Sequence, residues 1–253
     1  QLIRVEQGGW VPVAPSAIAQ LAGEPAPHAL DVAEMARIRD DFVVAAQRAH
    51  RIGIDAVELH FAHGYLLNEF LSPLSNRRED AYGGTFDQRV RFPMEVFAAV
   101  RDAWPREKPL GVRISATDWV DGGWTIDDSM ELARRLEAAC CDWIDVSSGG
   151  ISPAQQIPLG PGYQVPLARS LRRATTMAIM SVGLITDAAQ AEAIVAAGDA
   201  DLVAMARAML WDPRWPWHAA ARLGAQVPAP KQYWRAAPRD AAKVIVHAKV
   251  GAR

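Results

Sequence analysis

The sequence predicts an α/β fold in which parallel strands alternate with helices. Short apolar runs typical of buried strands recur along the 253 residues, and segments with helical spacing of apolar residues follow them. Such alternation implies parallel pairing through right-handed crossovers. Polar side chains also gather after the first strand, at His60, His63 and Tyr65. The carboxyl end of a strand is where α/β barrels and open α/β sheets place their chemistry.

The helices are predicted from N-caps and apolar periodicity. Asp31 is a good N-cap, apolar residues recur at helical spacing through Ala46, and Gly53 ends this first helix. Thr85 or Asp87 caps the second helix. The remaining helices are expected at 127–139, 166–174, 187–197 and 213–223, and Thr186 or Asp187 is the expected N-cap of the helix at 187–197.

The strands are predicted from short apolar runs bounded by turn-forming residues. They are expected at 56–59, 110–115, 143–147, 178–182 and 202–205. A closed barrel needs eight such units, whereas the chain has five. Residues 1–27 are expected to be a loop and residues 227–253 a C-terminal tail.

Composition excludes several classes of function. The 27 basic and 29 acidic side chains give a net charge of −2, which offers no electrostatic case for binding nucleic acid or an acidic membrane. No apolar run approaches the roughly 18 residues of a membrane span, and the N-terminus does not resemble a signal peptide. Cys140 and Cys141 are adjacent, which disfavours a disulfide between them, so reduced thiols in a cytoplasmic protein are expected.

His60 and His63 have two alternatives to a catalytic role. Each ring could be a structural histidine satisfied by backbone groups. A zinc site is the other alternative, but it needs three or four ligands, and the nearby carboxylates follow no familiar ligand spacing. No metal is therefore expected.

The run that begins at His60, H-F-A-H-G-Y-L-L-N-E-F-L-S-P-L-S-N-R-R-x-D-x-Y-G-G, resembles the signature of the Old Yellow Enzyme family. The resemblance is to its bacterial branch with His-x-x-His, and it continues more loosely over residues 9–235. It implies a TIM (β/α)8 barrel of which this sequence holds about five units, the N-terminal part being absent. It further implies that 1–253 form a single FMN-binding domain and that NADPH or NADH is the reductant. Gln1 resembles a cofactor-binding position that follows the third strand of the family's barrel.

The resemblance implies an ene-reductase. NAD(P)H reduces the flavin, a hydride passes to the β-carbon of an α,β-unsaturated carbonyl or nitro compound, and a proton reaches the α-carbon. His60 and His63 match the pair that donates hydrogen bonds to the substrate oxygen. Tyr65 matches a tyrosine near the α-carbon, and its phenol, protonated up to about pH 10, suits a general acid. A second tyrosine or water is another possible donor, and packing on the barrel rim is the structural alternative for Tyr65.

Arg113 is a candidate even without the resemblance, because an arginine inside an apolar strand is costly to bury unless it is paired. The resemblance places it at the pyrimidine edge of the flavin, where it stabilises the reduced anionic form. A guanidinium suits this role because it does not lose its proton. The structural alternative is an ion pair with Glu58 or Asp145.

Two weak motifs together suggest a phosphate site. Gly183 and Leu184 follow the fourth strand, and Ala206 and Arg207 follow the fifth. Loops after the last two strands of such barrels commonly hold a phosphate. The resemblance implies that this is the FMN phosphate, with Arg207 in charge-assisted contact. Ala206 replaces the family's usual glycine, which is tolerable if its φ is below zero. Cys140 stands where a helix-ending glycine is expected.

The remaining assignments concern substrate and partners. Tyr163 is expected to bound a pocket for a small activated alkene. Trp234 and Arg235 resemble a segment that reaches a neighbouring subunit's active site in a homodimer or homotetramer, although a solvated tail arginine is the alternative. No G-x-G-x-x-G follows a strand, so no separate nicotinamide-binding domain is expected. The alternative functions are reduction of nitro compounds or nitrate esters within the same family, and a non-catalytic barrel fragment that acts as a binding protein.

Overall fold

The computed structural model of the chain describes residues 3, 5–234 and 243–247. Its centre is a five-stranded parallel sheet whose strands lie side by side in the order in which they occur along the chain. The strands are β3 (Val57–Phe61), β4 (Leu110–Ser115), β5 (Trp143–Ser147), β6 (Ala178–Ser181) and β7 (Leu202–Val203). Gln1 and Arg235, which were expected at the cofactor and substrate sites, lie outside the described residues.

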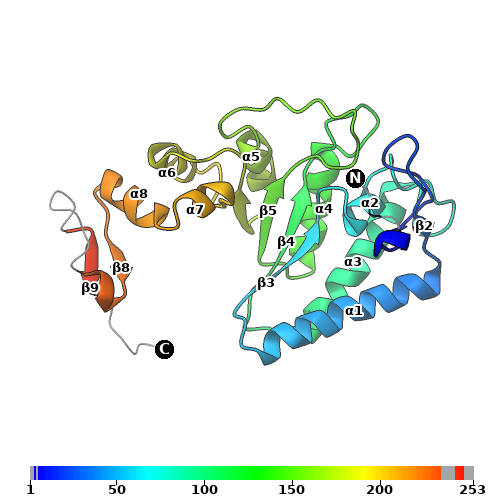
Figure 1. Ribbon diagram of the computed structural model, residues 1–253, viewed down its shortest axis with the longest axis horizontal. Coiled ribbons are helices and arrows are strands. Elements are labelled where there is room, and N and C mark those ends of the chain that lie inside the picture. Colours follow the sequence, from blue (N-terminus) through cyan, green and yellow to red (C-terminus); the bar gives the residue numbers. More distant parts are fainter. Residues whose placement is uncertain (1–2, 4, 235–242, 248–253) are drawn as a thin grey trace.

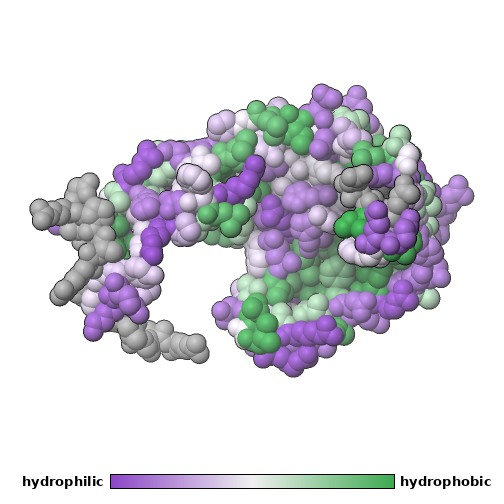
Figure 2. All heavy atoms as spheres, in the orientation of Figure 1, coloured by the Kyte–Doolittle hydropathy of each residue, from purple (hydrophilic) through white to green (hydrophobic). Residues whose placement is uncertain are grey.

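Helices follow these strands as predicted and cover the sheet in a curved layer (Figure 1). They are α1 (Val32–Arg51), α2 (Leu66–Leu71), α3 (Phe86–Ala103), α4 (Ile126–Ala138), α5 (Val165–Ala174), α6 (Ala188–Ala196), α7 (Arg207–Trp211) and α8 (Trp215–Leu223). Pairs of them pack together, α1 on α3, α4 on α5 and α6 on α8. The five units form an arc of the predicted TIM barrel, and Figure 2 shows the hollow within this arc open on one side.

Short elements flank the arc. They are η1 (Val5–Gln7), the parallel pair β1 (Val13–Ala14) and β2 (His28–Ala29), and, within the expected tail, β8 (Val227–Ala229), η2 (Lys231–Tyr233) and β9 (Ile245–His247). In the described part of the chain, β8 and β9 pair with each other and not with the five-stranded sheet. No helix in this part is long and apolar enough to cross a membrane.

The two faces of the sheet have different side chains because residues alternate along each strand. Apolar residues on the helix side form the core, including Phe61, Val112, Ile114, Ile144, Val146 and Ile179, each at most 1% exposed. The register aligns the opposite, inner face into rows across the sheet. One row runs through Glu58, Gly111 and Trp143, and the next through His60, Arg113 and Asp145. His60 and the charged residues of the strands therefore share the concave face.

The helix starts confirm the predicted caps. Asp31 forms a capping box with Glu34 at the start of α1. Thr85, rather than Asp87, caps α3, and Asp187 accepts hydrogen bonds from two backbone amides at the start of α6. Cys140 lies just beyond α4 with φ of 63°, so a cysteine occupies the left-handed position that a glycine usually takes after a helix.

Several boundaries were predicted wrongly. β3 extends to Phe61, so His60 lies within the strand and not after it. β7 ends at Val203 and not at Met205, and helix α7 begins at Arg207. Helices α2 and α7 were not predicted, η1 and β1 lie in the segment 1–27 that was expected to be a loop, and β2 directly follows that segment.

Gly111 makes room for the indole ring of Trp143, whose Nε1 donates to Glu58 Oε2 at 2.8 Å. A Cβ on Gly111 would overlap this ring. Gly111→Ala is therefore expected to lower the free energy of unfolding by about 1–3 kcal/mol, the usual cost of overpacking. Urea denaturation measures the change. Gly160→Ala is the matched control, because a Cβ there meets nothing within 4 Å; equal losses in the two variants would contradict this account.

Candidate functional site

Three of the predicted site residues meet at the carboxyl end of β3. The ring centroids of His60 and His63 are 5.1 Å apart, and those of His60 and Tyr65 are 5.4 Å apart. His60 projects from the inner face of the sheet, His63 follows the strand, and Tyr65 is the N-cap residue of α2. Tyr65 is 66% exposed, so its phenol is open to solvent and to a small molecule.

His63 is held in an unusual backbone conformation. Its φ is 62°, in the left-handed region that costs energy for a residue with a Cβ. Its backbone N–H donates to Ser115 Oγ at 2.9 Å, and its Nε2 lies 2.6 Å from Ser147 Oγ. The loop after β5 also packs closely against it, because a Cβ on Gly150 would overlap the backbone of His63. Strain of this kind persists only where the surrounding contacts enforce it, and it is common at functional sites.

The environment favours the neutral form of both histidines. Burial lowers the pKa of His63 to about 4, and the positive charge of Arg113 and the neighbouring His60 act in the same direction. Burial and then Arg113 also lower the pKa of His60. Near neutral pH, His63 therefore carries one ring N–H and no net charge, which suits a hydrogen-bond donor.

Arg113 forms one of the two ion pairs that were expected if its role is structural. Its Nε lies 3.3 Å from Asp145 Oδ2, while Glu58 instead accepts from Trp143. Burial raises the pKa of Asp145 to about 7, although Arg113 acts to lower it. Arg113 Nε and Asp145 Oδ1 are buried and have no hydrogen-bond partner within the described residues. The pair thus leaves polar atoms that a bound molecule can satisfy.

A cavity of about 380 Å³ joins the other predicted cofactor residues. It is lined by Arg113, Ser147, Tyr163 and Gln164 together with residues 182–186 and 204–208. Gly183, Leu184, Ala206 and Arg207, predicted from two separate motifs, are therefore brought together.

The backbone around this cavity has conformations typical of loops that bind a ligand through their backbone. Gly183 has φ of 120°, and a Cβ there would lie 2.7 Å from Gln164 Nε2. Leu184 has φ of 51°, so it shares the strained left-handed conformation of His63. Ala206 has φ of −111°, which meets the condition for an alanine at this position.

Sequence reasoning missed the buried residues that support the histidine. Ser147, Ser148 and Gln164 are each at most 7% exposed and are joined by hydrogen bonds. Two adjacent serines at the end of the predicted strand 143–147 were the available signal. Gln164 had no such signal, because it meets them only in the folded chain.

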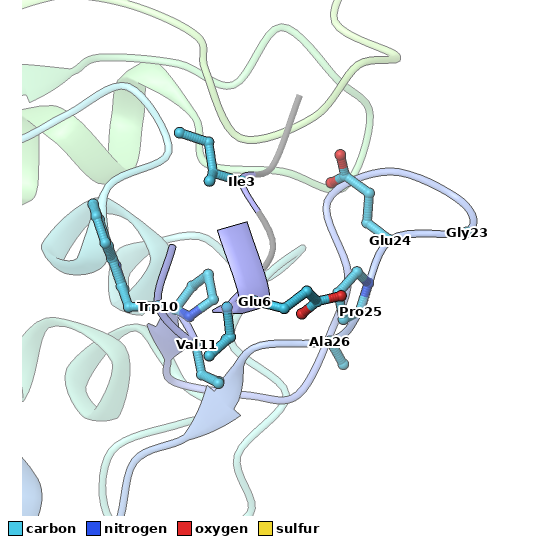
Figure 3. Close-up of a pocket in the computed structure, with 10 residues that line it drawn as sticks. Ile3, Glu6, Trp10, Val11, Gly23, Glu24, Pro25 and Ala26 are labelled. Atoms are coloured by element: carbon cyan, nitrogen blue, oxygen red, sulfur yellow. The ribbon is translucent and has the colours of Figure 1, made fainter. Parts of the chain in front are cut away.

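A larger cavity of about 700 Å³ lies away from these residues, in the N-terminal segment (Figure 3). It is lined by apolar side chains such as Trp10 and by Glu6 and Glu24, and it contains no residue predicted for the site. Within the described ranges, no group of three His, Cys, Asp or Glu side chains is placed to hold a metal ion. The candidate site is therefore the smaller cavity with the histidine cluster beside it.

Glu69, one turn after Tyr65 on α2, gives a pH-dependent prediction. Burial raises its pKa from 4.5 to about 7, so between these values the folded chain holds a proton that the unfolded chain has released. Stability contributed by this group falls as pH rises through that window, by at most about 1.4 kcal/mol per pH unit. Glu69→Gln should remove this pH-dependent contribution. The unfolding free energy of the variant, compared with that of the parent, should therefore rise from about pH 4.5 to 7. Urea titrations across this range test it, with exposed Glu107 changed to Gln as control; parallel profiles for Glu69→Gln and the parent would contradict it.

Comparison with known proteins shows extensive similarity. Residues 5–226 match the family described as NADH:flavin oxidoreductase / NADH oxidase. The chain is 45% identical over 223 residues to an NADPH dehydrogenase of Geobacillus thermodenitrificans and 47% identical to one of Geobacillus sp. strain WCH70. Each alignment covers 88% of this chain and 65% of the relative, so the chain spans about two thirds of their length.

Solved structures give the same result. A structure of morphinone reductase matches 98% of this chain and 66% of that chain, with 28% identity and a TM-score of 0.70. A 2-naphthoyl-CoA reductase in complex with 2-naphthoyl-CoA matches 86% of this chain and 34% of that chain, with 29% identity and a TM-score of 0.78.

Proposed function

Because the chain belongs to the NADH:flavin oxidoreductase / NADH oxidase family, the family of Old Yellow Enzyme, we propose that it is an FMN-dependent ene-reductase that consumes NAD(P)H. The substrates in this proposal are α,β-unsaturated carbonyl or nitro compounds. The observation that carries it is the meeting of His60, His63 and Tyr65 beside the cavity lined by Arg113. Two of the similar structures are named as reductases, which supports a reductase here.

The residues of the cavity fit FMN. Arg113 offers a permanent positive charge and an unsatisfied buried Nε, which suits the polar edge of a flavin ring. Gly183 and Leu184 on one loop and Ala206 and Arg207 on the next would hold the phosphate, with Arg207 supplying charge. When bound, FMN supplies the hydride for the reduction, and NADPH or NADH is its source.

The chain's own residues account for the rest of the chemistry. Neutral His60 and His63 donate hydrogen bonds to the carbonyl or nitro oxygen and stabilise the negative charge that develops on it. Tyr65 is exposed beside His60 and delivers a proton to the α-carbon from its phenol. Tyr163 lines the cavity and bounds the substrate pocket.

The proposal includes a homodimer or homotetramer. Trp234 Nε1 donates a hydrogen bond to Ala229 O at 3.0 Å. In this proposal Arg235 enters a neighbouring subunit's pocket. Size-exclusion chromatography with light scattering tests the assembly.

Absorbance spectroscopy of the purified full chain tests the function. Flavin absorbance that NADPH bleaches without oxygen and cyclohexenone restores is the expected result. Nitro compounds and nitrate esters in the same assay identify the second class of substrate. A colourless protein that takes up no added FMN would overturn the proposal and favour a non-catalytic barrel fragment.

A further inference from the structure

A buried chain of hydrogen bonds runs from the loop after β6 to the ring of His63. Gln164 Nε2 donates to Val182 O at 2.7 Å, and Ser148 Oγ donates to Gln164 Oε1 at 2.5 Å. Ser147 Oγ lies 3.4 Å from Gln164 Oε1 and 2.6 Å from His63 Nε2. Gln164 is 1% exposed, so water does not compete for these bonds. The donor and acceptor groups and their distances therefore determine the direction of each bond.

The orientation of the Gln164 amide follows from its partner at Val182. A backbone carbonyl only accepts hydrogen bonds, so the amide NH₂ must face Val182 O. The amide oxygen then faces the two serines. The opposite orientation would place two acceptors 2.7 Å apart in a buried site, which is costly.

The protons of the two serines follow in turn. Ser148 lies closer to Gln164 Oε1 and donates to it. A hydroxyl has one proton, and that of Ser147 can go to Oε1 at 3.4 Å or to His63 Nε2 at 2.6 Å. A separation of 2.6 Å is shorter than the roughly 2.7–3.2 Å usual when an N–H donates to oxygen, and it lies in the range of hydroxyl donors, whereas the 3.4 Å contact is weak. The distances therefore favour Ser147 as the donor to Nε2.

We infer that Ser147 donates its proton to Nε2 of His63 and thereby places the proton of this imidazole on Nδ1. Ser147 is a positioning residue in this account, supported by Gln164 and Ser148. The neutral state of the ring is required, and burial supports it by lowering the pKa of His63. No described residue forms a hydrogen bond with Nδ1, so this N–H is free to meet a ligand.

The consequence for catalysis rests on the proposed function. If His63 donates to the substrate oxygen, the donor is Nδ1–H, and Ser147 keeps it in that form before substrate arrives. The other tautomer would present a lone pair to an oxygen that gains negative charge, which repels it. Ser147 thus acts as the orienting partner that a functional histidine commonly has on its second nitrogen.

Proton–nitrogen correlation NMR of the full chain labelled with ¹⁵N-histidine tests the inference without cofactor or turnover. His63→Gln assigns the signals by their loss. We expect His63 to show the neutral Nδ1–H form near neutral pH, and Ser147→Ala to reduce that form in favour of Nε2–H. Ser147→Thr, which restores the hydroxyl, is expected to recover it. Ser170→Ala removes a serine hydroxyl that bonds Pro166 O elsewhere and should change nothing.

Each outcome has a distinct meaning. An Nε2–H form in the parent protein, or a tautomer that Ser147→Ala leaves unchanged while Ser147→Thr is folded, overturns the inference. A protein with the Nδ1–H form that binds no FMN retains the inference and loses the proposed function. An active flavoprotein with the Nε2–H form retains the proposed function and overturns the inference.

Discussion

Replacing His63 with alanine is expected to slow alkene reduction by about 10²–10³-fold, the usual effect of removing one donor from an oxyanion site. In the proposed mechanism this histidine donates to the oxygen that gains charge, so the loss should fall on the chemical step more than on substrate binding. Stopped-flow oxidation of the reduced protein by cyclohexenone measures this step directly.

His60→Ala is expected to give a loss of similar size, because both rings would donate to the same oxygen. The matched control is His28→Ala, which removes a histidine that pairs with Glu34 at the start of α1, away from the site. A loss in His63→Ala no larger than that in the control would exclude the proposed role.

Arg113→Met is expected to lower the free energy of unfolding by about 3 kcal/mol at about pH 9, because it leaves a buried carboxyl group without its ion-pair partner. The side chain of Asp145 is only 4% exposed, and Arg113 is its ion-pair partner. Urea denaturation of the chain without added cofactor isolates this effect from FMN binding.

Two features distinguish this account from general loss of packing. The double variant Arg113→Met/Asp145→Leu should recover most of the stability, because it removes the unpaired charge. The penalty of Arg113→Met should also shrink as the pH falls from 9 toward 7 and be smallest below 7, because burial raises the pKa of Asp145 to about 7 and the protonated group carries no charge. An equal penalty at low and high pH, or a double variant no more stable than the single one, would contradict it.

The main sheet was predictable because each strand presents apolar residues to the helices. The apolar runs that contain Ile144 and Ile179 predicted the bounds of β5 and β6 to within one residue. The predicted strand 56–59 ended too early because the inward-facing His60 interrupts its apolar run, although Phe61 continues the alternation. Helix α2 was missed because four of its six residues are buried, so it has no amphipathic period. Helix α7 has only five residues and likewise gives no period.

The candidate site was predictable where its residues are close in the sequence. His60, His63 and Tyr65 come from one strand and its loop, so local spacing brought them together. The ion pair of Arg113 with Asp145, rather than Glu58, depends on the register between β4 and β5. Gln164 contacts Ser147 across 17 residues, and only the folded chain shows that contact.

The strand order has a consequence for how the chain folds. The strands β3 to β7 pair in chain order, so each pairing joins strands of neighbouring units. Such a linear arrangement resembles a repeat array, in which structure can begin in one unit and spread to its neighbours. Each parallel pairing must nevertheless close a crossover, the longest of which runs from Phe61 to Leu110, and pairing of this kind is slow compared with local contacts. Backbone amides of β5, with two strands on either side, should exchange with solvent most slowly, and protection should decline toward β3 and β7.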